Sequence, residues 1–137
     1  MLPRGWHTWQ PVPALMPGIT DPVVRVVAIS GPWRFAEHGC QVAAFTFSAG
    51  AVALVVAEWV DPRNAPGLPR RPSHFTPANL PLHPPPAIEC WAGPGGSVEF
   101  VDRGRRFGAY LLVGRRAQPR LVARARAVLD TLRVAAR

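Results

Sequence analysis

The sequence predicts an α+β domain: an antiparallel sheet of four to five strands, a C-terminal amphipathic helix packed on one face, and a long proline-rich loop. Three observations favour this architecture. Residues 97–113 have the pattern of two strands joined by a tight turn, residues 119–134 repeat apolar side chains with a helical period, and prolines interrupt residues 61–94 too often for a central strand. A chain of 137 residues allows one such domain with its own core.

The C-terminal hairpin carries the clearest strand pattern. Side chains alternate in character along residues 97–102, as in a strand with at least one buried face. Asp102, Arg103 and Gly104 supply turn chemistry, so the next strand, residues 106–113, is expected to return antiparallel. Both faces of this second strand are apolar, which predicts a central position in the sheet.

The last predicted element is a helix from about Pro119 to Val134. Proline suits the first helical turn because its missing N–H has no partner there to lose. At 100° per residue one set of side chains falls within about 120° and is expected to face the sheet: Leu121, Val122, Ala125, Val128, Leu129 and Leu132. The charged set lies outside this arc: Arg120, Arg124, Arg126, Asp130 and Arg133.

The preceding chain divides into an N-terminal Trp/Pro-rich arm, residues 1–20, and a single domain, residues 21–135. Residues 23–30 are expected to form a strand, residues 33–39 a loop, and residues 40–47 either a strand or one or two helical turns. Residues 51–60 form the most apolar strand, which predicts a second central position. Glu58 is expected near the end of that strand, where water or an arginine reaches it. The proline-rich segment is expected to run extended over the surface, with a brief strand at most at residues 88–91.

The positive charge is concentrated at the C-terminal end. All 16 basic residues are arginine, a bias typical of high-GC coding sequences, and the net charge is +8. Residues 103–137 hold ten arginines and one acid (net +9), whereas residues 1–102 hold six and seven (net −1). A basic end of this kind is either a solvated surface or a footprint for anionic partners. The candidate surface comprises Arg103, Arg105, Arg106, Arg115, Arg116, Arg120 and Arg124.

Cys40 and Cys90 leave several alternatives open. In an exported chain they would close a loop of about fifty residues worth roughly 4 kcal/mol, whereas in the cytosol they would remain thiols. His38, His83 and Glu89 complete a set of zinc-ligand types, but their spacing is wrong for a structural zinc site. No cofactor or metal is therefore expected. The opening residues lack the apolar stretch of a signal peptide, and the longest apolar run, residues 49–57, is too short to span a bilayer. The chain is therefore expected to be either cytosolic or numbered from after a removed leader or anchor.

The other constellations do not match catalytic sites. A Cys-His arrangement lacks any sign of a stabilised thiolate. The carboxylate pairs Glu58/Asp61 and Glu99/Asp102 are three residues apart on strands, which places each pair on opposite faces, and exposed positions near sheet edges are expected for them. Glycines 93, 95 and 96 are not followed by a Lys-Ser/Thr pair and a helix, so a turn is expected rather than a phosphate cradle. Trp6, Trp9 and Trp33 are candidate partner-binding aromatics, although anchoring roles in the core or arm fit them better.

Several of these positions together resemble a group of short, uncharacterised bacterial proteins of high-GC, actinobacterial type, many of which follow a membrane anchor or leader. The resemblance covers about residues 5–135 and rests on packing and turn positions: Gly5-Trp6, Ser30, Cys40, Glu58, Pro72 and Phe75, Glu89-Cys90, Phe100, Gly104-Arg105, Phe107, Gly114, Leu129-Asp130 and Leu132. It implies an extracytoplasmic setting and a bridged Cys40–Cys90 pair, but no catalytic residue. More remotely, the C-terminal hairpin and helix are similar to the Mog1/PsbP-type α/β sandwich, whose members are mostly non-enzymatic adaptors and assembly factors.

The sequence therefore predicts a non-catalytic domain that binds a protein or a cell-envelope component. The alternative is a module for anionic partners, either nucleic acid or phospholipid headgroups, bound through the arginines of the C-terminal hairpin and helix. Nucleic acid is less favoured because no helix-turn-helix, zinc-finger or RNA-recognition pattern accompanies these arginines. The sequence does not define the oligomeric state.

Overall fold

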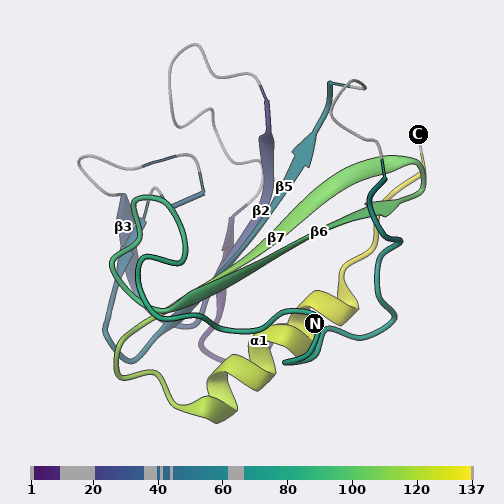
Figure 1. Cartoon of the computed structure of the whole chain (residues 1–137). Helices are drawn as coiled ribbons and strands as arrows, with labels where there is room; N and C mark the ends of the chain where they lie inside the picture. The colour runs from purple at the N-terminus through teal and green to yellow at the C-terminus, as the bar shows by residue number, and fades with distance from the viewer. Residues whose placement is uncertain are drawn as a thin grey trace.

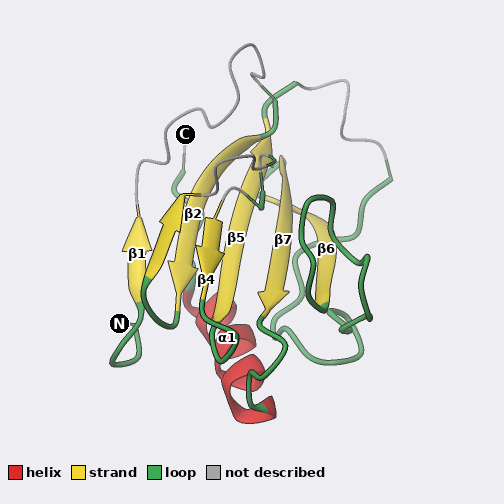
Figure 2. Cartoon of the chain, turned by 90° about the vertical axis from the view of Figure 1, so that its left-hand side faces the viewer, coloured by secondary structure: helices red, strands yellow, loops and turns green. Residues whose placement is uncertain are grey.

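The computed structural model describes residues 2–9, 21–35, 40, 42–43, 45–61 and 67–136, with Trp9 described by its backbone alone. Its main element is a five-stranded antiparallel sheet with the strand order β1-β2-β5-β7-β6 (Figures 1 and 2). The strands are β1 (His7–Trp9), β2 (Val23–Ile29), β5 (Val52–Trp59), β6 (Gly95–Asp102) and β7 (Arg105–Val113). A second sheet pairs β3 (Trp33–Phe35) with β4 (Phe45–Phe47), and one helix, α1, spans Pro119–Thr131. The predicted α+β class is confirmed.

Both strands that the apolar pattern predicted to be central have a neighbour on each side. β5 lies between β2 and β7, and β7 lies between β5 and β6. All residues of β5 from Val52 to Glu58 are buried, because strands on both sides cover its edges and a layer of side chains covers each face. The tight turn at Arg103 and Gly104, both with positive φ, joins β6 to β7 as the sequence predicted.

The helix and the small sheet cover opposite faces of the main sheet (Figure 2). Side chains of α1, among them Val122, Ala125 and Leu129, pack with Leu54 and Leu111 in one core layer. The second layer brings Phe45 of the small sheet, together with the nearby Ala43, against the opposite face of β5. No helix in the described part of the chain is long and apolar enough to span a bilayer.

Residues 67–94 of the proline-rich segment run along the β6 edge of the sheet and over part of the helix (Figure 1). Its backbone pairs with β6 at two places, Arg70 with Val101 and His83 with Gly95. Phe75 and Leu80 are buried in the helix-side core, so this segment contributes to the core rather than only running over it. Residues 88–91 form a turn and not a strand.

Three further predicted elements differ from the structure. Residues 33–35 form β3 rather than a loop, because their backbone pairs with β4, whose sequence was ambiguous. The predicted arm supplies β1, an edge strand paired with β2, and buries Trp6, while residues 10–20 lie outside the described residues. The helix ends at Thr131 and not near Val134, because Leu132 is extended (φ −65°, ψ 141°).

Candidate functional site

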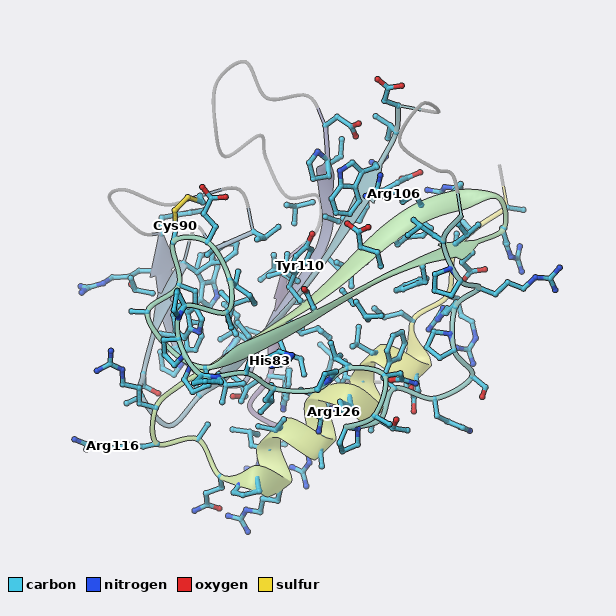
Figure 3. The ribbon with its side chains drawn as sticks, in the orientation of Figure 1. His83, Cys90, Arg106, Tyr110, Arg116 and Arg126 are labelled. Atoms are coloured by element: carbon cyan, nitrogen blue, oxygen red, sulfur yellow. A yellow bond between two sulfur atoms is a disulfide. The ribbon has the colours of Figure 1, made fainter. Side chains whose placement is uncertain are left out.

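The seven arginines of the predicted basic surface do not share one face. Arg103 is exposed at the hairpin tip. Arg105 and Arg106 follow one another on β7 and therefore point to opposite faces of the sheet, where they meet Glu58 and Glu99. Figure 3 shows Arg106 on the face away from the helix. Arg105 and Arg106 thus belong to ion pairs on two separate faces.

The remaining four arginines lie at the other end of β7, and three of them gather around one hollow. Arg115 donates from Nη2 to the Ala92 carbonyl, 3.3 Å away. Arg116, Arg120 and Arg124 line a hollow of about 490 Å³ beside the start of α1, and we call these three side chains the arginine hollow. The lining is completed by Gly50, Gln118 and Leu121, none of which is acidic. Figure 3 shows Arg116 extending outward from the connection between β7 and α1.

The arginine hollow has no internal counter-charge. Within the described residues, none of its three guanidinium groups forms an ion pair or a side-chain hydrogen bond. The first turn of α1 contains no acidic residue, and the side chain of Gln118 does not cap the helix. This end of the helix carries the positive partial charge of the peptide dipoles, so cationic side chains are unfavourable there. The spacing of four residues between Arg120 and Arg124 adds repulsion.

Glu58 is the only buried acidic residue in the described part of the chain, and it was expected to be exposed near a sheet edge. The predicted exposure of Glu58 is wrong, whereas its predicted proximity to an arginine is confirmed. Arg105 donates from Nε and Nη2 to the carboxylate at 2.7 and 2.8 Å, and Arg25 donates from Nε at 2.8 Å. The bonds from Arg105, assisted by those from Arg25, lower the pKa of Glu58 to about 2 against the opposing effect of burial.

The other paired carboxylates considered from the sequence do not converge. Glu99 bonds Arg106 at 2.8 Å on one face, and Asp102 bonds Arg71 at 3.2 Å on the other. Asp61, which follows the end of β5 at Trp59, is half-buried, whereas Glu58, three residues earlier, is fully buried. Neither pair therefore forms the two-carboxylate geometry of a general acid and base.

Cys40 and Cys90 lie with their sulfur atoms at bonding distance and their Cα atoms 5.7 Å apart, as a disulfide. Glu89 is next to them, which makes the only three-residue group of metal-ligand types in the described residues. Both thiols are used by the bridge, so they are not free to bind zinc or to act as nucleophiles. His83 pairs through its backbone with Gly95 on β6, and His38 lies outside the described residues.

The three glycines near residue 95 are required for close packing. Gly95 and Gly96 belong to β6 rather than to the expected turn. A Cβ atom on Gly93 would lie 2.6 Å from the Val113 carbonyl oxygen, and one on Gly96 would collide with the Pro81 carbonyl. These positions bring backbones together and do not form a phosphate cradle.

The aromatic residues have mainly packing roles. Trp6 is buried in the helix-side core, and Trp33 packs edge-on against Phe35 and Phe45. On the face away from the helix, Arg106 lies 4.5 Å above the Trp59 ring. Burial raises the pKa of nearby Tyr110 to about 12, so its hydroxyl stays protonated at neutral pH.

Sequence reasoning missed Arg126, which was placed on the solvent side of the helix. Arg126 is buried, and its Nε and Nη2 donate to the Leu80 carbonyl at 3.2 and 2.9 Å. Figure 3 shows it between the helix and the proline-rich segment. Burial lowers its pKa. The proline content of the segment predicted that it runs extended, but it did not show which face of the helix the segment covers.

Comparison of the chain with protein-family models, with curated proteins and with solved structures finds no match.

Proposed function

We propose that this domain is non-catalytic and binds an anionic component of the cell envelope, the headgroups of anionic phospholipids, through the arginine hollow. The observation that carries the proposal is the set of three guanidinium groups around one hollow without an acidic partner in the described residues. A guanidinium group offers five N–H donors in a geometry that suits phosphate oxygens. Three of them around one concave surface provide more donors than a single phosphodiester headgroup requires.

The electrostatic cost of this arrangement supports a binding role. A cation in the first turn of a helix, where Arg120 lies, destabilises it by roughly 0.3–1 kcal/mol, and the repulsion between Arg120 and Arg124 adds a few tenths. An anion in the hollow reverses both effects, because it is attracted by the arginines and by the N-terminal end of α1 together. A bound anion therefore removes the electrostatic destabilisation that the arginines cause at this end of the helix.

A phospholipid surface is favoured over nucleic acid by the disulfide and by the size of the hollow. A disulfide persists in oxidising compartments, where anionic lipid surfaces are accessible and nucleic acid is scarce. The hollow holds three arginines, fewer than the roughly six to ten phosphate contacts of a strongly salt-dependent DNA-binding protein.

The non-catalytic part of the proposal is supported by the state of the reactive groups. Glu58 has a pKa of about 2 and is bonded to two arginines, so it neither accepts nor releases a proton near neutral pH. The two cysteines are bonded to each other. These groups stabilise the fold instead of reacting with a substrate.

The proposal is tested by sedimentation with vesicles of phosphatidylcholine alone and of phosphatidylcholine with phosphatidylglycerol at about three to one. Binding is expected to the anionic vesicles only, and to weaken as salt is added. The variant Arg116→Gln/Arg120→Gln/Arg124→Gln loses three charges near the surface, each worth about 1 kcal/mol, and should bind on the order of a hundredfold more weakly.

The matched control replaces three exposed arginines elsewhere, Arg4→Gln/Arg70→Gln/Arg103→Gln, and so removes the same net charge. It should keep most of the binding. Equal loss in both triple variants would refute the hollow as the site, because non-specific charge would then account for binding. Stronger retention by duplex DNA than by anionic vesicles would overturn the choice of partner.

A charge reversal separates binding from folding. Arg120→Glu places an acidic side chain in the first turn of α1, which the helix dipole favours, and it removes the repulsion with Arg124. The variant is expected to unfold at equal or higher denaturant concentration than the unmodified protein while losing its affinity for anionic vesicles. A variant that is less stable and still binds would contradict the proposed role.

A further inference from the structure

A second pocket lies at the opposite end of the helix, under the chain that follows α1. Its volume is about 270 Å³, and it is bounded by the last turn of the helix, by Val134 and Ala135, and by one end of the sheet. The floor and walls are apolar: Val26, Val56, Phe75, Phe100, Phe107 and Leu129. A cavity of about 150 Å³ holds benzene, so this pocket has room for about ten non-hydrogen atoms.

The rim of the pocket is cationic. Arg25, Arg71, Arg105 and Arg133 all line it. Two carboxylates oppose these four charges directly, because Arg25 and Arg105 share Glu58 and Arg71 bonds Asp102. Asp130 is close by, but its carboxylate accepts bonds from the Phe75 N–H and the His74 ring. The rim thus keeps an excess of positive charge over an apolar interior.

Two of these arginines have donors to spare. Arg25 uses only Nε, toward Glu58, and within the described residues its two Nη groups have no hydrogen-bond partner, while 45% of its side chain is exposed. Arg133 bonds only main-chain carbonyls, those of Asp130 and Leu132, through Nη1. In contrast, Arg71 and Arg105 are occupied by carboxylates and by carbonyls of the last helical turn and the following chain.

We propose that this pocket binds a small apolar carboxylate, an aliphatic or aromatic acid of about ten non-hydrogen atoms. The carboxylate accepts hydrogen bonds from the free Nη groups of Arg25 and from Arg133 at the rim. The hydrocarbon part lies against Phe107 and Val56 on the floor. Such a ligand matches both the charge excess of the rim and the apolar lining, whereas a neutral or cationic ligand matches only one of them.

This site is independent of the arginine hollow. The hollow lies beside the start of α1 and the pocket beside its end, and they share no lining residue. The triple arginine-to-glutamine variant of the hollow should therefore bind the carboxylate normally. Failure of either proposal leaves the other unaffected.

The test is isothermal titration calorimetry of the whole chain with octanoate, which has ten non-hydrogen atoms. Octan-1-ol keeps the tail without the charge, octylamine reverses the charge, and acetate lacks the tail. Octanoate should bind saturably at one site, and each of the other three should bind at least about tenfold more weakly, since a charge-assisted hydrogen bond contributes about a factor of ten or more.

Three variants locate the binding. Arg133→Gln and Arg25→Gln should each weaken octanoate binding about tenfold or more. Val26→Phe fills the pocket from β2 without changing the charge and should abolish binding. Arg103→Gln, which removes an exposed charge from the nearby hairpin tip, should have no effect.

Circular dichroism checks that each variant is folded. Because Arg25→Gln also removes a partner of Glu58, Arg133→Gln and Val26→Phe remain informative if it unfolds. The proposal is overturned by equal affinity for octanoate and octan-1-ol, by unchanged binding to folded Val26→Phe, or by the absence of saturable binding to the folded chain.

Discussion

Replacement of Glu58 by glutamine tests how the neighbouring strands β2, β5 and β7 are held together at this end of the sheet. Glu58 has no exposed surface, and its carboxylate accepts bonds from Arg25 and Arg105. Glutamine has the same size but no charge, and its NH₂ group faces a guanidinium group that also donates. The variant therefore leaves two partly buried cations without their shared counter-charge.

The magnitude follows from the pKa of Glu58. A change from the ordinary value of 4.5 to about 2 corresponds to about 3 kcal/mol of stabilisation of the folded state. The folded-state pKa is depressed, so this stability is fully present above about pH 4.5 and is lost as the pH falls toward about 2. Glu58→Gln should lower the free energy of unfolding at neutral pH by about 3 kcal/mol, or the melting temperature by about 10 °C.

The assay is urea unfolding followed by tryptophan fluorescence at a series of pH values from about 7 to about 2. Other carboxylates also titrate in this range, so the informative quantity is the difference in unfolding free energy between the two proteins. This difference should shrink toward zero at the acidic end. Glu99→Gln, which removes a more exposed partner of Arg106, serves as the control and should cost at most about 1 kcal/mol.

A difference below about 0.5 kcal/mol at neutral pH would refute the reasoning, because it would mean that solvent replaces the carboxylate at no cost. A difference that stays constant between about pH 5 and pH 2 would also refute it, since the effect would then come from packing rather than from charge.

Three further changes test other contacts. Arg126→Met removes the bonds to the Leu80 carbonyl and should lower the unfolding free energy by about 1–2 kcal/mol in urea, whereas the exposed Arg124→Met should change it by less than about 0.5. Reduction of the Cys40–Cys90 bond opens a loop of 50 residues and should lower the melting temperature, which corresponds to a loss of about 2–4 kcal/mol in the free energy of unfolding. In the control, a variant with both cysteines replaced by serine, added reductant should not change the melting temperature. Gly108→Ala places a Cβ atom 2.7 Å from the indole ring of Trp59 and should lower the free energy of unfolding by about 1–3 kcal/mol, measured by thermal unfolding. An unchanged melting temperature would show that the Trp59 ring moves aside freely.

The elements predicted well from the sequence are those specified by nearby residues. The hairpin of β6 and β7 combines alternating side chains with a two-residue turn at Arg103 and Gly104, and α1 combines a helical period with Pro119 at its start. Each signal lies within the element itself. The three-residue strands β1 and β3 were missed because strands this short have no periodicity of their own and form only through pairing with β2 and β4.

Burial of charge was not predictable for a related reason. Glu58 meets its partners at separations of 33 and 47 residues, and Arg126 meets Leu80 at a separation of 46. Such contacts depend on how the whole chain folds and leave no local pattern. The basic C-terminal end was visible in the composition, but its division into ion pairs and one unpaired group required the structure.

The two ends of α1 show why abundance of arginine alone does not explain the arginine hollow. At the C-terminal end, Arg71 donates to the carbonyls of Leu129 and Leu132, where the helix dipole favours a cation. At the N-terminal end, the arginines of the hollow have neither a carbonyl nor a carboxylate partner in the described residues, and the dipole opposes them. A coding bias toward arginine would place arginines at both ends of the helix, but it does not explain why, within the described part of the chain, those at one end have partners and those at the other end do not. Under the proposed function, variants of Arg71 should therefore change stability, whereas variants in the hollow should change binding to anionic vesicles.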